Sequence, residues 1–91
     1  MEHQVVILPS ADKDLDSLAP EVRTAVLKRM RWLGLNAEEI VHHRLQNLPA
    51  ELDGLCRLRQ GDYRILYWRT PAERMIKVYR VRHRSEVYRD L

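Results

Sequence analysis

The sequence predicts an α+β fold: an antiparallel β-meander, joined by an amino-terminal strand, with helices packed on one face. Three observations predict it. A short apolar segment opens the chain, amphipathic helical spacing follows as far as about residue 45, and three strand-like segments with short turns fill most of the rest. Helices that are separate from a meander along the chain typically cover one face of its sheet. Ninety-one residues can enclose one core, so residues 1–91 are expected to form a single domain.

The first expected strand and helix lie within the opening sixteen residues. Residues 4–8, QVVIL, have the apolar run of a short buried strand, and Pro9 is expected to stop it. Ser10 is a residue type that caps helix amino termini. Asp12 and Asp14 would then lie in the first turn, where the helix dipole favours negative charge.

Two more helices are expected before the strands begin. Pro20 suits the first position of a helix, which Gly34 or Asn36 should end. Asn36 and Glu39 have the spacing of a capping arrangement and predict a short third helix through about Leu45. The second helix has the clearest apolar stripe in the chain, formed by Val22, Val26, Met30 and Leu33.

Residues 55–60, 63–69 and 75–81 predict the three strands of the meander. Residues 55–60 alternate weakly, residues 63–69 are rich in aromatic and β-branched side chains, and residues 75–81 read MIKVYRV. The turn residues at 61–62 and the loop at 70–72 separate them. Alternation does not assign the faces of the middle strand cleanly, which indicates strong twist or a bulge. Ser85 is expected to cap a final helical turn.

Charge is unevenly distributed along the chain. Residues 1–50 contain six Lys/Arg and seven Asp/Glu, whereas residues 51–91 contain ten and six, and nine of those ten are arginine. Arginine has a planar fork of donors that fits phosphate. The basic half therefore favours a nucleic acid or an acidic protein as partner, with an ordinary solvated sheet face as the alternative.

Several functional classes are not expected. Cys56 is the only cysteine, so no internal disulfide forms, and no Cys/His spacing predicts a metal site or another cofactor. We expect Cys56 to be a small buried side chain in a strand. No apolar run is long enough to cross a bilayer, and the amino terminus lacks the basic stretch of a secretory signal. These observations predict a cytoplasmic protein that does not enter a membrane.

The candidate site consists of arginines on successive strands. Arg57 and Arg59 are two residues apart and therefore share a face of their strand. Arg64 follows on the next strand, Arg82 ends the third, and Tyr88 comes shortly after. Several guanidinium groups on one face repel one another, so the pattern favours a bound anion. A scissile phosphate, whose charge grows in the transition state, is such an anion.

Two motifs resemble a known family. Residues 57–67, RLRQGDYRILY, and residues 82–88, RHRSEVY, are similar to the RelE/ParE superfamily of type II toxin–antitoxin toxins, and specifically to its RelE-like mRNA interferase branch. The order of expected elements resembles that family too. The specific match spans about residues 52–88.

The resemblance implies a metal-independent endoribonuclease that binds the ribosomal A site and cuts messenger RNA there. In such toxins the ribose 2′-hydroxyl attacks the adjacent phosphate, which leaves a cyclic phosphate and a free 5′-hydroxyl. By position, Tyr88 matches the general base, Arg82 the group that stabilises or protonates the leaving oxygen, and Arg64 the residue that holds the phosphate. Arg57 and Arg59 stand where the best-known member has lysines.

Those two substitutions remove any lysine able to shift its pKa for proton transfer. His83 is the candidate substitute, because histidine titrates near neutrality. The alternative is a partly exposed residue at the end of a strand. Nearby arginines would stabilise a tyrosinate at Tyr88, whereas packing of its ring on the sheet is the structural alternative. Arg84 is expected to add a phosphate contact.

Two rival functions remain open. A ParE-like toxin would share the fold but inhibit DNA gyrase without cutting RNA, and a binding module would have lost activity. Arg59, Arg64, Arg82 and Tyr88 together favour RNA cleavage, because ParE-like chains tend to lack the full set. Either toxin would have a small, acidic antitoxin partner with a segment that folds on its surface.

Overall fold

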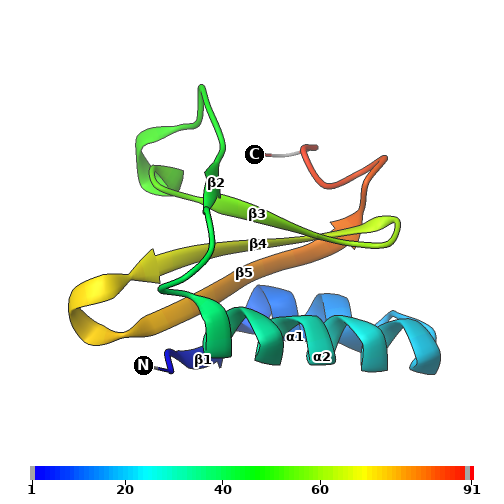
Figure 1. The fold of residues 1–91 in the computed structure, drawn as a ribbon. Helices are drawn as coiled ribbons and strands as arrows, with labels where there is room; N and C mark the ends of the chain where they lie inside the picture. The colour runs from blue at the N-terminus through cyan, green and yellow to red at the C-terminus, as the bar shows by residue number, and fades with distance from the viewer. Residues whose placement is uncertain (1, 90) are drawn as a thin grey trace.

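Two α-helices lie against one face of a five-stranded sheet in the part of the chain that this computed structural model describes, residues 2–89 and 91 (Figure 1). The strands lie in the order β1-β5-β4-β3-β2, with β1 parallel to β5 and the other neighbours antiparallel. The predicted α+β class is confirmed. The elements are β1 (Gln4–Ile7), α1 (Pro9–Asp16), α2 (Pro20–Asn36), β2 (His43–Arg44), β3 (Cys56–Gln60), β4 (Tyr63–Thr70) and β5 (Met75–His83), with 3₁₀ turns at Ala50–Leu52 and Pro71–Glu73.

The β3–β4–β5 meander forms as predicted. Gly61 has a φ of +58°, which permits the two-residue turn that joins β3 to β4. The predicted irregularity is a register shift: Leu66 pairs with Arg80 and Tyr67 with Val78, so Tyr79 is an extra residue in β5. This bulge rotates Tyr79 toward the same side as its neighbour Trp68, and their ring centroids lie 5.1 Å apart.

The main core lies between the helices and the sheet. Val26, Met30 and Leu33 of the predicted α2 stripe are buried there, and Val22 packs against them. A smaller cluster lies on the opposite face, which we call the outer face, where Leu55, Leu66 and Val87 are buried. Cys56 is buried in β3, as predicted. Within the described residues, no helix is long and apolar enough to cross a bilayer.

Helix α2 ends at Asn36, as predicted, but Gly34 lies inside it. The amide of His3 donates to the Gly34 carbonyl at 2.8 Å, so the chain before β1 passes directly over this turn of the helix. A Cβ atom at Gly34 would lie 2.8 Å from both the His3 carbonyl oxygen and Val5 Cγ2. Glycine is therefore required here for close packing and does not end the helix.

The expected capping role of Ser10 is wrong. Helix α1 begins at Pro9, and the Ser10 hydroxyl donates to the Tyr79 carbonyl at 2.6 Å. The Asp14 carboxylate accepts the Val81 amide at 2.9 Å and two hydrogen bonds from the Arg80 guanidinium. The reason is that β1 ends opposite Val78, which leaves the rest of the β5 edge without a neighbouring strand. Side chains of α1 supply the missing partners.

The expected third helix is also wrong. Residues 37–40 form turns and a bend, the short strand β2 follows at His43–Arg44, and the side-chain amide of Asn36 donates to the Trp32 carbonyl. His42 links this loop to the sheet. Its Nδ1 lies 2.6 Å from the Tyr67 hydroxyl and its Nε2 lies 2.6 Å from the Ala37 carbonyl oxygen. These long-range contacts override the local helix preference.

The two ring contacts of His42 also fix its tautomer. A carbonyl only accepts, so His42 Nε2 carries the proton and, in the neutral ring, Nδ1 accepts from Tyr67. Burial raises the pKa of Tyr67, which keeps its hydroxyl protonated as that donor.

The expected helical turn after β5 does not form as a helix. Residues 84–89 make successive turns, and the Ser85 amide bonds to His83 Nδ1 at 3.2 Å. Ser85 therefore turns toward the end of β5 and caps no helix. The part of this expectation that falls on residue 90 lies outside the described residues.

The contact of Asp14 in α1 with Arg80 and Val81 in β5 is expected to stabilise the fold. Asp14→Ala is expected to lower the free energy of unfolding by about 1–3 kcal/mol, because the Val81 amide and Arg80 lose this acceptor. Urea denaturation followed by tryptophan fluorescence measures the change. Asp12→Ala in the same helix is the control and should change the value by about 0.5 kcal/mol or less, since Asp12 is exposed. Equal losses in both variants would contradict the assignment.

Candidate active site

Three arginines from three neighbouring strands lie side by side, and we call Arg59, Arg64 and Arg82 the arginine row. In the sheet register Arg59 of β3 pairs with Arg64 of β4, which pairs with Arg82 of β5. Residues directly opposite each other in an antiparallel ladder extend from the same face of the sheet. The sequence-predicted arginines are therefore brought together on one face.

That face is the outer face, away from the helices. The next row along the sheet is Leu58, Ile65 and Val81, and these side chains pack with the helices. Because side chains alternate along a strand, the arginine row extends the other way. Arg57 lies two residues from Arg59 and shares this face, opposite Leu66 of the outer cluster.

Two members of the row lack an acidic partner. Neither Arg59 nor Arg64 pairs with a carboxylate among the described residues. Arg64 instead turns back to the β3–β4 turn, where its Nη1 donates to the carbonyls of Gly61 at 3.0 Å and Tyr63 at 2.9 Å. Arg59 is exposed, and its carbonyl accepts from Arg29 of α2 at 3.1 Å. The guanidinium groups thus present uncompensated positive charge to solvent.

Tyr88 lies beside this positive surface. The segment after β5 folds back over the outer face, away from the helices (Figure 1). The buried Val87 anchors it, and the next side chain, Tyr88, is 47% exposed. Arg57 Nη1 lies 3.4 Å from the Tyr88 hydroxyl oxygen and donates to it. The structure therefore brings the predicted tyrosine into contact with one of the predicted arginines.

Glu86 is a residue of the site that the sequence analysis did not assign. Its carboxylate lies 3.9 Å from Arg82 Nη2, at a distance typical of a weak, partly exposed ion pair. The two residues are four apart, and that spacing in a turn-forming segment is the signal that would have identified Glu86. The contact restrains Arg82 without neutralising the rest of the row.

His83 and Arg84 are held in other ways. His83 pairs with Tyr63 in the sheet, on the helix-covered face, and the two rings meet edge to face at 5.5 Å. Its Nδ1 accepts the Ser85 amide, so the proton of the neutral ring is on Nε2. Arg84 Nε lies 3.7 Å from an Asp62 carboxylate oxygen, at the hairpin turn beside the row. The His83 ring and the Arg84 guanidinium therefore both lie outside the arginine row.

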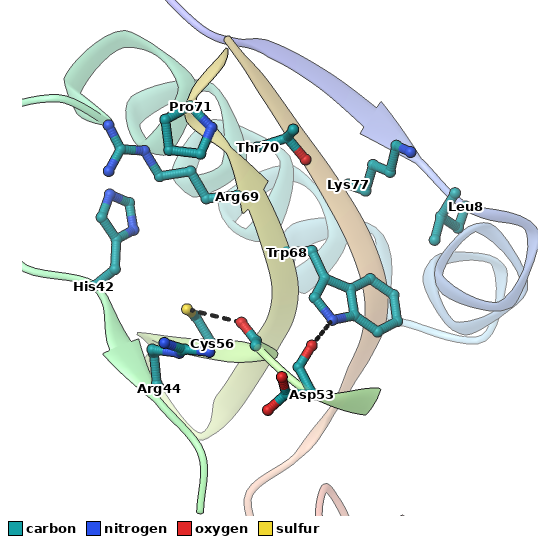
Figure 2. Close-up of a pocket in the computed structure, with 11 residues that line it drawn as sticks. Leu8, His42, Arg44, Asp53, Cys56, Trp68, Arg69, Thr70, Pro71 and Lys77 are labelled. Carbon is teal, nitrogen blue, oxygen red and sulfur yellow. Dashed lines mark hydrogen bonds between the residues drawn. The ribbon is translucent and has the colours of Figure 1, made fainter. Parts of the chain in front are cut away.

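A wide hollow lies at the other end of the sheet (Figure 2). Its volume is about 810 Å³, and Trp68 and Lys77, which pair across β4 and β5, are on its wall. Trp68 is four residues beyond Arg64, which corresponds to about 13 Å along a strand. Trp68 Nε1 donates to the Asp53 carbonyl at 3.0 Å, and Cys56 Sγ lies 3.4 Å from the Gly54 carbonyl oxygen. This hollow is separate from the arginine row.

In the described part of the chain, no cluster of metal-binding side chains lies at the arginine row or at the hollow beside Trp68. Within residues 2–89 and 91, no three His, Cys, Asp or Glu side chains are grouped so that they could hold a metal ion. The polar side chains gathered at the outer face are guanidinium groups and a phenol, with the Glu86 carboxylate beside Arg82. Guanidinium groups and a phenol bind an anion, stabilise growing negative charge and exchange one proton.

The helix-covered sheet is the fold of the small toxins of the RelE/ParE superfamily, which come from type II toxin–antitoxin systems. This chain belongs to the family described as "ParE toxin of type II toxin-antitoxin system, parDE", whose sequence profile matches residues 5–88. No curated protein is similar enough in sequence to count as a relative.

Solved structures have the same fold. A chain of the RelBE2 toxin–antitoxin complex of Mycobacterium tuberculosis is 28% identical, with a TM-score of 0.80 over 94% of this chain and 95% of that one. A chain of the archaeal RelE–RelB complex of Pyrococcus horikoshii is 24% identical, with a TM-score of 0.71 over 96% and 100%. The isolated E. coli RelE toxin is 22% identical, with a TM-score of 0.69 over 94% and 90%.

Cys56 makes a testable probe of this structure. Burial raises the pKa of its thiol, and the residue is only 4% exposed, so little thiolate is available at neutral pH. We expect Cys56 to react with an aromatic disulfide reagent far more slowly in the native protein than in urea. Absorbance of the released thiolate measures the rate, and rapid native labelling at pH 7 would show that the β3 end of the sheet is open.

Proposed function

We propose that this toxin is a metal-independent endoribonuclease that cuts messenger RNA on the ribosome. The observation that supports this proposal is the arginine row on one face, with Tyr88 in contact with the neighbouring Arg57. Like charges opposite one another in a sheet are destabilising, so the row favours an anion as ligand. The phosphodiester of RNA is such an anion, and it has its own nucleophile in the 2′-hydroxyl.

The reaction is an internal transfer of the phosphoryl group. Tyr88, as tyrosinate, removes the proton from the ribose 2′-hydroxyl, and the 2′-oxygen forms a bond to the adjacent phosphorus. The bond from phosphorus to the 5′-oxygen of the next nucleotide breaks, and that oxygen takes a proton from water. The products are a 2′,3′-cyclic phosphate and a 5′-hydroxyl, and no water is added in this step.

Each arginine has a position in this scheme. Arg57 donates to the Tyr88 oxygen and so holds the phenol that acts as base beside the arginine row. Arg59 and Arg64 hold the phosphate, whose negative charge increases as the 2′-oxygen attacks. Arg82 stabilises charge on the leaving oxygen. A guanidinium almost never releases its proton, so Arg82 acts through charge.

Proton transfer is not assigned to His83 in this proposal, because its ring packs with Tyr63 on the helix-covered face. Arg84 is assigned a supporting contact with the RNA backbone from the edge of the site, where Asp62 already holds it loosely. Action on translated messenger RNA places the protein in the cytoplasm.

We also propose a cognate antitoxin partner. The solved structures with which this chain shares its fold include toxin–antitoxin complexes. An acidic segment that folds on the outer face would neutralise the arginine row and cover Tyr88.

Cleavage of messenger RNA by stalled ribosomes tests the proposal. Tyr88→Phe removes the base and is expected to lower the cleavage rate by about 100-fold or more, a typical contribution of general base catalysis. Arg82→Ala should lower it by a similar factor. Primer extension locates the cuts, and end-labelling identifies the cyclic phosphate. Circular dichroism should show that both variants fold, and wild-type rates in both would refute the mechanism.

Gyrase inhibition is the second candidate, and the match to the ParE toxin family favours it. A supercoiling assay with purified gyrase and relaxed plasmid separates the two functions. On the endoribonuclease proposal, the wild type leaves supercoiling unchanged at concentrations that cut RNA. Inhibition of supercoiling without any RNA cut would instead assign this chain to the gyrase inhibitors.

A further inference from the structure

A groove lies beside the arginine row, where helix α2 meets the β3 edge of the sheet. Its volume is about 410 Å³, and its lining includes Arg29 and Trp32 of α2, Val41 of the following loop, and Arg57 and Arg59 of β3. Strand β2 pairs only with Cys56 and Arg57, so the β3 edge beyond Arg57 has no neighbouring strand. The groove therefore opens directly from the arginine row.

The charge of this groove has one sign. Its titratable side chains are three arginines and a histidine, and no carboxylate lines it. Two of those arginines, Arg57 and Arg59, also belong to the outer face described above. A concave surface lined by one sign of charge attracts a ligand of the opposite sign. A nucleic acid strand held at the arginine row would thus continue into the groove without meeting a negative side chain.

Arg29 is fixed in place before any ligand arrives. Its Nε donates to the Arg59 carbonyl at 3.1 Å, and its guanidinium carbon lies 4.1 Å from the centre of the Trp32 ring. Neither contact uses a carboxylate, so the positive charge is not neutralised. The terminal nitrogens remain available as a fork of donors, which is the geometry that binds a phosphate.

The groove also has an apolar surface at its mouth. Trp32 is 36% exposed and Val41 is 77% exposed. Proteins bind unpaired bases by stacking them on aromatic rings or on arginine planes. The Arg29–Trp32 pair offers both kinds of surface beside a cationic row. The groove's volume of about 410 Å³ lies in the range of pockets that bind small ligands.

We propose that this groove is a subsite for one unpaired nucleotide that flanks the cleavage point in the RNA. Its phosphate binds Arg29, and its base packs on Trp32 and Val41. Stacking of this kind accepts any base. The subsite therefore adds affinity and positions the RNA strand along the arginine row, but it does not select a sequence. The inference rests on the proposed endoribonuclease function, because it assumes that RNA occupies the arginine row.

The test measures binding separately from cleavage. A fluorescent RNA oligonucleotide with 2′-O-methyl riboses cannot be cut, and its anisotropy reports binding to the purified toxin. Arg29→Gln and Trp32→Leu are each expected to weaken binding at least fivefold, since one stacked base contributes about 1–3 kcal/mol. Arg29→Gln should also reduce the slope of affinity against salt concentration by about one unit.

Matched controls lie on the same helix. Arg31→Gln removes an exposed arginine outside the groove, and Leu35→Ala removes a 47% exposed apolar side chain outside it. Both should bind the oligonucleotide as the wild type does. Removing the terminal nucleotide that enters the groove should abolish the difference between Arg29→Gln and the wild type, because the subsite is then empty. Oligonucleotides shortened at the 5′ end and at the 3′ end are compared to identify that nucleotide.

The outcomes separate the subsite from the proposed function. If Arg29 and Trp32 affect binding but the toxin cuts no RNA, the endoribonuclease proposal fails, and the groove is a nucleotide-binding site that flanks no cleavage point. If the toxin cuts RNA and the groove variants bind like the controls, the subsite is wrong. It is also wrong if those variants weaken antitoxin binding alone, or if the wild type does not bind the oligonucleotide.

Discussion

The strand register of the meander is the constraint on which the candidate site depends. Arg59, Arg64 and Arg82 form a row only because β3, β4 and β5 pair with these residues directly opposite one another. A slip of one residue between two strands would move an arginine to the helix-covered face. The tight turn at Gly61, with its positive φ, fixes the β3–β4 register at the end of the sheet where the row lies.

That register has an electrostatic cost. Two unit charges 4 Å apart repel each other by about 1 kcal/mol in water and by about 4 kcal/mol near a protein surface. Arg64 reduces the repulsion by turning its guanidinium toward the carbonyls of Gly61 and Tyr63, and Arg82 does so by approaching Glu86. Both adjustments use weak or neutral acceptors. The row therefore keeps most of its positive charge. A polyanion that binds there supplies the negative partners that these arginines lack in the free protein.

The features that local sequence determines were predicted well. The meander, the α2 stripe, the burial of Cys56 and the shared face of Arg57 and Arg59 follow from periods of two or 3.6 residues and from turn-forming residues. An irregularity was predicted for the middle strand, because residues 63–69 have large apolar side chains on both sides, and the extra residue lies in its partner strand β5.

The features that the sequence did not predict depend on partners distant in the chain. Ser10 and Asp14 have the residue types and spacing of a helix start, but their acceptor and donors are 65 or more residues away in β5. His42 is likewise held by Tyr67, 25 residues later. Arg29 lies on helix α2 but contacts strand β3, where it donates to the carbonyl of Arg59 in the arginine row. No local pattern encodes such contacts, because the same residues would satisfy their hydrogen bonds within a helix or in water.

The position of the proposed base follows from packing in a second, smaller core. Tyr88 is not held by a helix; it follows Val87, which is 1% exposed in the outer cluster with Leu55 and Leu66. Leu66 lies next to Ile65 in β4, so one strand contributes to both cores by alternation. The outer cluster has few members, and a segment held by few apolar contacts is among the first to open. Opening of this segment would separate Tyr88 from Arg57 and Glu86 from Arg82, while the main core and the β3–β4–β5 register stay intact.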